Sequence, residues 1–179
     1  MNIANKLTTL RVVLIPIFLV VLLSPLVAEP MSRYIAVCIF IVASITDFLD
    51  GYIARSRNMV TNFGKFMDPL ADKLLVCSAL VSMVELGDLP AWVVIIILSR
   101  EFAITGFRTL AMEANIVMAA SWWGKIKTTT QMIMIIVVLL NIQNSAMNIV
   151  ELILIVLAVF FTIVSGIDYI VKNKSVLKG

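Results

Sequence analysis

Two stretches of sequence decide the fold: DFLDGYIAR at residues 47–55 and GKFMDPLAD at residues 64–72. The first closes an apolar run over residues 34–54, and the second overlaps the start of another over residues 69–86. Runs of this length predict membrane-spanning helices, because about 20 apolar residues cross the hydrocarbon core of a bilayer. The short connection between them, about residues 55–67, predicts a tight return that makes the two helices antiparallel.

Apolar runs of similar length flank this hairpin on both sides. We expect six transmembrane helices, over residues 10–27, 34–54, 69–86, 90–112, 118–141 and 146–171. The composition agrees, since 61% of the 179 residues are hydrophobic, against roughly 45–50% in an ordinary soluble domain. Six spans use about 120 residues, so no separate soluble catalytic domain fits. The sequence predicts an all-α membrane protein with one six-helix transmembrane catalytic domain, residues 1–179.

The distribution of lysine and arginine sets the orientation, because positive residues are retained on the cytoplasmic side. With the amino terminus inside, the outer loops hold only Arg33, and Arg100 lies within a span. The basic residues at the cytoplasmic ends are then Lys6, Arg11, Arg55, Arg57, Lys65, Lys73, Arg108, Lys125, Lys127, Lys172, Lys174 and Lys178. An even number of helices places both termini in the cytoplasm. We expect a multi-pass protein of the cytoplasmic (inner) membrane whose active site faces the cytoplasm.

Composition also excludes several kinds of chemistry. The chain has no histidine, which removes histidine general bases, histidine-dependent triads and histidine metal ligands. The net charge of +3 is small for a nucleic-acid-binding protein, and the basic residues segregate by membrane side, so we exclude nucleic acid as a partner. Cys38 and Cys77 lie in apolar runs without CxxC spacing, which favours inert packing residues.

Four aspartates stand at the cytoplasmic end of the predicted hairpin. Asp47 and Asp50 are three residues apart, and Asp68 and Asp72 are four apart, so each pair shares one face of its helix. An aspartate at the centre of a membrane helix costs about 2.5–3.5 kcal/mol, and divalent cations would neutralise all four with hard oxygen ligands. Carboxylates without histidine or thiolate favour Mg²⁺ or Mn²⁺ over zinc. The alternative is a salt-bridged hairpin or an ion pathway.

Small residues and an arginine follow the first carboxylate pair. Gly51 and Ala54 lie about one helical turn apart, which leaves room for a flat ligand against the backbone or, equally, for close helix packing. The guanidinium of Arg55 beside a metal cluster indicates a ligand that carries phosphate.

The combined pattern DxxDGxxAR, eight residues, then GxxxDxxxD, starting at Asp47, resembles the signature of the CDP-alcohol phosphatidyltransferase family, with all eight signature positions filled. The resemblance implies a six-helix membrane fold and a homodimer. It also implies transfer of the phosphatidyl group of a CDP-linked lipid to an alcohol, with release of CMP.

The resemblance further implies a role for each carboxylate. Asp47 and Asp68 would bridge two metal ions, Mg²⁺ or Mn²⁺. Asp50 would complete one site and Asp72 the other. Asp72 would also take the proton from the attacking alcohol. The residues implied in binding the CDP-lipid are Gly51 and Ala54 near the cytidine, Arg55 and Thr61 on the diphosphate, and Asn5 and Thr8.

Basic residues on the fourth and fifth predicted helices bear on the acceptor. We expect one cytoplasmic pocket to contain four of them, Arg100, Arg108, Lys125 and Lys127. A phosphorylated acceptor needs such positive charge, whereas a neutral acceptor does not. The alternative is positive-inside anchoring with a pair between Arg100 and Glu101.

Three stretches resemble the bacterial phosphatidylglycerophosphate synthase branch of the family: REFAITGFR from Arg100, GKIKT from Gly124 and NKLTTLR from Asn5. This resemblance implies CDP-diacylglycerol as the donor, sn-glycerol 3-phosphate as the acceptor, and phosphatidylglycerophosphate and CMP as products.

Two other functions remain open. The first is the same chemistry with another acceptor, such as phosphorylated inositol, serine, or a diacylglycerol paired with a CDP-amino-alcohol. The second is a cation channel or transporter built around the carboxylates. A transporter would place polar residues at midplane depth on several helices, whereas the first, fifth and sixth predicted helices have almost none there, because Asp168 lies near a cytoplasmic end.

Overall fold

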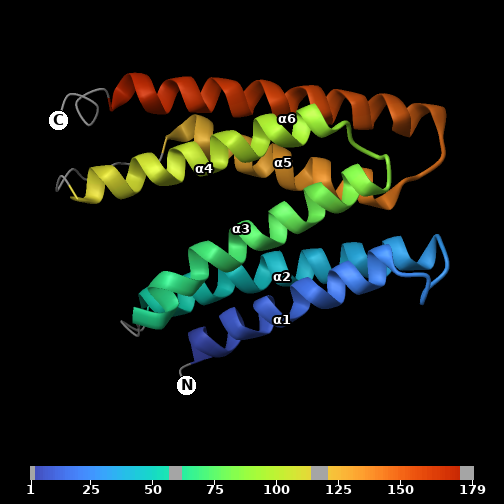
Figure 1. The fold of residues 1–179 in the computed structure, drawn as a ribbon, viewed down its shortest axis with the longest axis horizontal. Helices are drawn as coiled ribbons and strands as arrows, with labels where there is room; N and C mark the ends of the chain where they lie inside the picture. Colours follow the sequence, from blue (N-terminus) through green and yellow to red (C-terminus); the bar gives the residue numbers. More distant parts are fainter. Residues whose placement is uncertain (1–2, 57–61, 114–120, 174–179) are drawn as a thin grey trace. The chain divides into compact units, whose positions relative to one another are not determined.

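A computed structural model of the chain describes residues 3–56, 62–113 and 121–173, and side chains for residues 8–46, 67, 70–112 and 121–173. In these ranges the structure is all-helical (Figure 1). The six helices are α1 (Ile3–Leu23), α2 (Met31–Ser56), α3 (Asn62–Glu85), α4 (Ala91–Glu113), α5 (Trp122–Leu140) and α6 (Ser145–Lys172). The predicted all-α class is confirmed, and each predicted span falls mainly on one helix.

The helices of the predicted hairpin are longer than the apolar runs that predicted them. α2 continues to Ser56 and α3 begins at Asn62, so helical backbone extends into the predicted return from both sides. A helix satisfies its own backbone hydrogen bonds, and it can therefore continue past the apolar run into polar sequence. As a result, both aspartate pairs lie on regular helix.

The chain forms two compact units, residues 1–88 with 139–141 and residues 89–138 with 142–179. In the first unit, α1 packs against α2 and α3, and α2 also contacts α3. The rings of Phe18 and Phe40 meet between α1 and α2 with their centroids 6.4 Å apart. α1 begins, α2 ends and α3 begins at one end of this unit (Figure 1). The antiparallel course therefore brings the two aspartate-bearing helix ends together.

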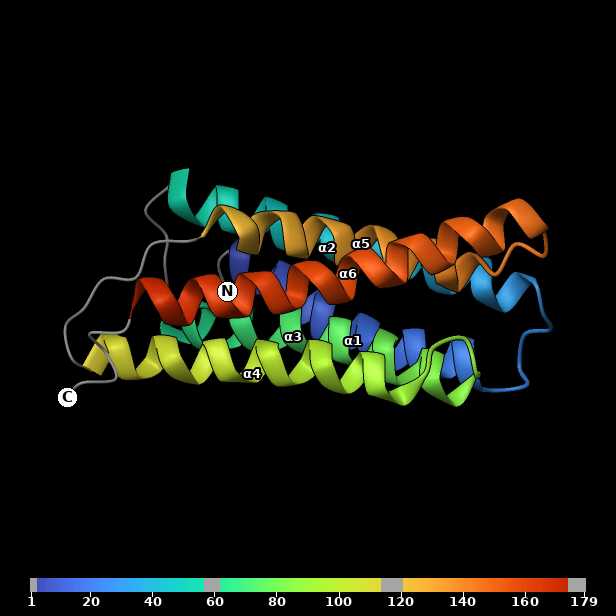
Figure 2. The same cartoon turned by 90° about the horizontal axis from the view of Figure 1, so that it is seen from above.

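In the second unit, α4 and α6 pack side by side, as two perpendicular views show (Figures 1 and 2). α5 joins them through side chains, including Trp123 and Phe161, whose rings stack with centroids 6.2 Å apart. α4 ends, α5 begins and α6 ends at one end of this unit (Figure 1). Arg108 on α4 and Lys125 and Lys127 on α5 lie toward that end, and Arg100 lies near the middle of α4.

The opposite end of the first unit is held by an arginine. Arg33 NH1 and NH2 donate to the two carboxylate oxygens of Asp88 at 2.6 and 3.2 Å, and Arg33 Nε donates to Glu29 at 3.0 Å. Burial opposes the charge of Arg33, but these hydrogen bonds outweigh it and hold the pKa of the guanidinium above its usual value. The single basic residue predicted in the outer loops is thus neutralised by two acids.

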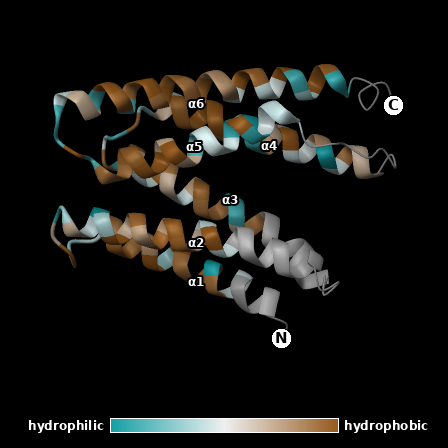
Figure 3. Ribbon diagram, turned by 180° about the vertical axis from the view of Figure 1, so that it is seen from behind, coloured by the Kyte–Doolittle hydropathy of each residue, from teal (hydrophilic) through white to brown (hydrophobic). Residues whose placement is uncertain are grey.

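The exposed surface of α6 has the character of a membrane helix. Its outward residues at three- and four-residue spacing are apolar, from Leu152 through Val156 and Phe160 to Ile163, whereas its buried side includes Thr162, Ser165 and Tyr169. Figure 3 shows the same apolar character along the helix. Apolar residues outside and hydroxyl groups inside are the reverse of a helix in water and suit a helix in lipid.

Length and composition support this reading. In the part of the chain that the structure describes, α5 and α6 are long and apolar enough to cross a membrane. Two shorter apolar segments are Thr8–Leu23 of α1 and Met31–Thr46 of α2. The first follows the charged start of α1, and the second precedes the aspartates of α2.

Candidate active site

The predicted metal ligands lie on two packed helices. Asp47 and Asp50 are on α2, and Asp68 and Asp72 are on α3, in the parts of these helices nearest the connection between them. The side chain of Asp72 is exposed, and the side chains of the other three lie outside the described residues. The four residues are all carboxylates on two contacting helices, and hard oxygen donors of this kind fit Mg²⁺ or Mn²⁺.

No group of three or more metal-ligating side chains occurs among the side chains that the structure describes. Those side chains include Asp72 but not its three predicted partners. The two-metal arrangement therefore stays a prediction that rests on the sequence pattern and on the packing of α2 against α3.

The predicted residues of the donor site lie mostly outside the described side chains. Gly51, Ala54 and Arg55 are on the helical backbone of α2, and Asn5 is on that of α1. Thr61 lies outside the described residues altogether.

Thr8 is the predicted donor-site residue whose side chain the structure describes, and it is buried on α1, with 1% of its surface exposed. Arg11, three positions further along, is fully buried although it carries a charge. From the sequence, Arg11 is one of the basic residues at the cytoplasmic helix ends and part of the NKLTTLR stretch, but no site is assigned to it. The signal that could have marked it is an arginine one helical turn after a threonine, directly before the apolar part of α1.

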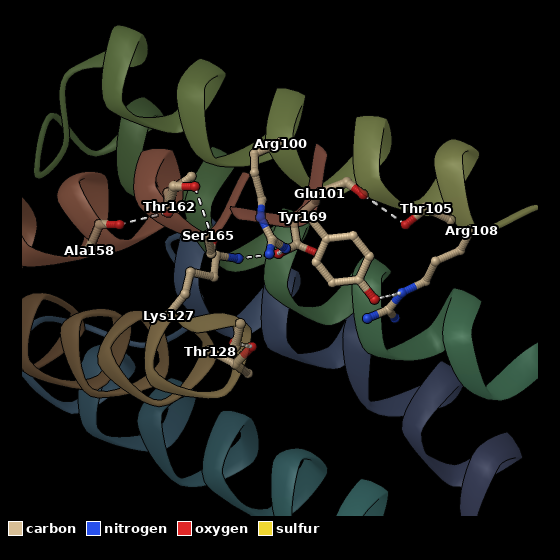
Figure 4. Close-up of polar contacts among 11 residues, drawn as sticks. Arg100, Glu101, Thr105, Arg108, Lys127, Thr128, Ala158, Thr162, Ser165 and Tyr169 are labelled. Carbon is tan, nitrogen blue, oxygen red and sulfur yellow. Dashed lines mark hydrogen bonds and ion pairs between the residues drawn. The ribbon is translucent and has the colours of Figure 1, made fainter. Parts of the chain in front are cut away.

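In the second unit, a carboxylate links two of the predicted acceptor cations. Glu101 on α4 pairs with the ammonium of Lys127 on α5, and its Oε1 lies 3.4 Å from Arg100 NH1 (Figure 4). Lys127 is buried, with 1% of its surface exposed. The predicted pair of Arg100 and Glu101 exists, and Glu101 also serves Lys127, which the sequence did not indicate.

The side chain of Arg100 lies close to two glycines, with its aliphatic part near Gly166 and its guanidinium near Gly124. A Cβ on Gly166 of α6 would lie 3.4 Å from Arg100 Cγ, and one on Gly124 of α5 would lie 3.8 Å from Arg100 NH2. Arg100 Nε is buried without a hydrogen-bond partner among the described residues. An unpaired buried donor is costly, so an anionic ligand at this position would be stabilised.

Arg108 is held by the sixth helix. Its Nε donates to the hydroxyl of Tyr169 at 2.9 Å, and its guanidinium carbon lies 5.2 Å from the centre of the tyrosine ring (Figure 4). Tyr169 itself is buried, with 1% of its surface exposed. No sequence pattern singled out Tyr169, because its partner lies 61 positions away.

Lys125 has different surroundings from Lys127. Its side chain is exposed, and its ammonium lies 5.7 Å from the centre of the Trp122 ring. The structure thus divides the four predicted acceptor cations: Arg100 and Lys127 share Glu101, Arg108 pairs with a tyrosine, and Lys125 stands at the surface.

A second polar contact joins the same helix ends. The carboxylate of Asp168 on α6 accepts a hydrogen bond from the hydroxyl of Ser121, the residue that precedes α5, and pairs with Lys172 at 2.8 Å. Ser121 and Asp168 are 47 positions apart. The sequence placed Asp168 near a cytoplasmic helix end but did not connect it to Ser121.

Comparison with known proteins identifies the class of protein to which the chain belongs. Residues 1–164 match the family described as CDP-alcohol phosphatidyltransferase. The chain belongs to this family, and it is a transferase of phospholipid biosynthesis. The resemblance seen in the sequence is confirmed, and the reading of the carboxylates as part of a channel or transporter is set aside.

Individual relatives carry more specific names. A Bacillus subtilis (strain 168) protein named CDP-diacylglycerol–glycerol-3-phosphate 3-phosphatidyltransferase is 45% identical, with 99% of this chain and 97% of the relative covered. A Haemophilus influenzae protein of the same name is 40% identical, with 98% and 95% covered. A Mycobacterium tuberculosis protein named probable phosphatidylglycerophosphate synthase is 40% identical, with 96% and 81% covered.

Proposed function

We propose that this enzyme transfers the phosphatidyl group of CDP-diacylglycerol to sn-glycerol 3-phosphate, giving phosphatidylglycerophosphate and CMP. The observation that carries the proposal is the 45% identity, over nearly the full length of both chains, to a relative named for this reaction. The buried cations of the second unit support the choice of a phosphorylated acceptor.

In this proposal, residues 1–179 act as one catalytic domain with six membrane spans. Both termini and the active site face the cytoplasm, in the inner (cytoplasmic) membrane, and the enzyme is a homodimer. The exposed apolar face of α6 and the predominance of basic residues at one set of helix ends support the membrane topology. At that boundary the lipid donor stays in the leaflet while CMP and the acceptor exchange with water.

The donor site is assigned to the first unit. Asp47, Asp50, Asp68 and Asp72 would hold two divalent ions, Mg²⁺ or Mn²⁺. When bound, such a pair of ions binds a diphosphate and stabilises the negative charge that develops on the phosphoryl group and on leaving CMP. The residues assigned to the CDP-lipid are Gly51 and Ala54 beside the cytidine, Arg55 and Thr61 on the diphosphate, and Asn5 and Thr8.

The acceptor site is assigned to the second unit. In the contacts of Figure 4, the cations Arg100, Arg108 and Lys127 accompany one carboxylate, Glu101. A phosphomonoester carries nearly two negative charges at neutral pH, and a group of three cations would attract it. Lys125, at the surface, would add to the attraction of the acceptor toward this cluster.

The chemical step needs one base. The hydroxyl of the acceptor attacks the phosphorus of the phosphatidyl group, and Asp72 accepts the hydroxyl proton. A new O–P bond to the acceptor forms as the O–P bond to CMP breaks. A carboxylate is an adequate base here because the hydroxyl loses its proton only as the new bond forms. The exposure of Asp72 lets that proton pass on to water.

The test is a CMP-release assay with the purified full-length protein, CDP-diacylglycerol and Mg²⁺. The acceptors are glycerol 3-phosphate, inositol, inositol phosphate, serine and glycerol at equal concentration. We expect glycerol 3-phosphate to be used far better than the others. Equal or better use of free inositol or serine would contradict the proposed acceptor.

A further inference from the structure

The sixth helix contacts both of the helices that carry the acceptor cations. Two consecutive residues near its end, Asp168 and Tyr169, make side-chain hydrogen bonds with these helix ends. Tyr169 reaches Arg108 on α4, and Asp168 reaches Ser121 at the start of α5. Neither residue belongs to the family motif, and neither is one of the three cations assigned to the acceptor, Arg100, Arg108 and Lys127.

The contact between Tyr169 and Arg108 fixes one edge of the guanidinium. The tyrosine hydroxyl accepts from Nε at 2.9 Å, and among the described residues no hydrogen bond to NH1 or NH2 accompanies it. Those two nitrogens are a pair that can bind phosphate in a bidentate manner. Because Tyr169 is buried, its ring and hydroxyl are held in place and can hold the arginine in turn.

The choice of a tyrosine has a chemical consequence. A carboxylate at this position would neutralise Arg108 and compete with an incoming phosphate. The neutral hydroxyl orients the guanidinium and leaves its charge available to the ligand. Because the guanidinium is oriented before the ligand arrives, binding loses less conformational entropy.

The contact between Asp168 and Ser121 acts on the other cationic helix. Ser121 immediately precedes Trp122, the first residue of α5, and Lys125 and Lys127 follow within the first two turns. A carboxylate near a helix amino terminus is also favoured by the helix dipole. The hydrogen bond thereby ties the start of α5, and the two lysines that follow it, to α6.

We propose that Asp168 and Tyr169 of α6 are positioning residues for the acceptor phosphate, Tyr169 through Arg108 and Asp168 through Ser121. The inference rests on the proposed function, because it concerns how that acceptor site is held together. It predicts that α6 contributes to the affinity for glycerol 3-phosphate without contacting the reacting atoms.

The principal test is Tyr169→Phe, which removes the hydroxyl and keeps the ring. We expect the KM for glycerol 3-phosphate to rise about three- to tenfold, as the loss of one hydrogen bond predicts. The kcat and the KM for CDP-diacylglycerol should stay near wild type. Tyr34→Phe is the matched control, because Tyr34 is an exposed tyrosine at the start of α2, and it should change none of these values.

A double variant separates positioning from a general structural role. If Tyr169 acts through Arg108, adding Tyr169→Phe to Arg108→Ala should raise the KM for the acceptor no further. Additive effects, or a joint change in kcat and both KM values, would overturn the role of Tyr169. So would an unchanged acceptor KM in Tyr169→Phe while Arg108→Ala raises it, a result that leaves the proposed function standing. A wild-type protein that does not use glycerol 3-phosphate would overturn both proposals.

The second tether is tested by Ser121→Ala and Asp168→Asn. Both should raise the KM for glycerol 3-phosphate by a similar factor, about two- to fivefold for one weakened hydrogen bond. Lys172→Ala is the control, because it removes the other partner of Asp168 and leaves Ser121 in place. An effect of Lys172→Ala equal to that of Asp168→Asn, with Ser121→Ala silent, would overturn the role of Asp168 through Ser121.

Discussion

The acidic helix ends of the first unit and the basic helix ends of the second differ in how the chain assembles them. The aspartates come in two pairs with spacings of three and four residues on neighbouring helices. The basic cluster depends on contacts between residues 26, 47 and 61 positions apart. The acidic end is therefore visible as a local pattern, whereas the basic end exists only after α4, α5 and α6 have packed.

This difference also bears on how charge is tolerated in apolar helices. In the second unit the chain supplies its own partners, since Glu101 serves Arg100 and Lys127, and Tyr169 serves Arg108. In the first unit, we propose that the aspartates depend on metal ions from outside the chain. Removing a charge should therefore have unequal effects at the two ends.

The largest effect is expected at the acidic end. Asp47→Asn or Asp68→Asn removes an anionic ligand proposed to bridge two metal ions, and CMP release should fall to background. Treatment with EDTA should abolish the activity of the wild-type enzyme, and added Mg²⁺ or Mn²⁺ should restore it.

Glu85→Gln is the control for this change, because Glu85 is an exposed acid at the far end of α3 and its loss should leave activity intact. Substantial CMP release by Asp47→Asn or Asp68→Asn would contradict the two-metal proposal.

The features that the sequence predicts are local, and those that it does not predict depend on packing between distant segments. The all-α fold, the helical setting of Asp47 and Asp72 and the family were all predictable, because periodic apolar runs and a fixed motif are local features. The partners of Arg108 and Lys127 were not, because no spacing rule links a tyrosine on one helix to an arginine 61 positions earlier. The helix ends around residues 56 and 62 were also missed, because hydropathy marks the apolar run and not the helix.

A smaller effect is expected at the basic end. Arg108→Ala removes a guanidinium held for phosphate, and a charge-assisted hydrogen bond contributes about 1.5–3 kcal/mol. The KM for glycerol 3-phosphate should rise roughly ten- to a hundredfold, with the KM for CDP-diacylglycerol nearly unchanged. Steady-state CMP release with each substrate varied in turn measures both. Equal weakening of donor and acceptor would mean that Arg108 acts through general electrostatics.

Burial predicts a difference between the two lysines of α5. Lys127→Ala removes a buried cation and leaves Glu101 with one fewer partner, so it should raise the acceptor KM by about tenfold or more. Lys125→Ala removes an exposed cation that water and salt screen, so an effect within about fivefold is expected. The ratio of the two acceptor KM values, at low and at physiological salt, measures the difference. A larger effect at Lys125 would place the acceptor at the surface and not in the cluster.

The smallest effect on catalysis is expected at the end of the first unit that lies opposite the aspartates. Arg33→Met keeps the length of the side chain but leaves Asp88, with 13% of its side-chain surface exposed, without the guanidinium that binds both of its oxygens. Stranding such a group costs about 1–3 kcal/mol, so the apparent Tm in detergent should fall by several degrees while both KM values stay unchanged. Adding Asp88→Leu removes the stranded carboxylate and should recover part of the lost stability, because replacing both members of a buried pair by apolar groups is often neutral. A changed acceptor KM at an unchanged Tm would show that Arg33 serves the reaction and does not merely hold the unit together.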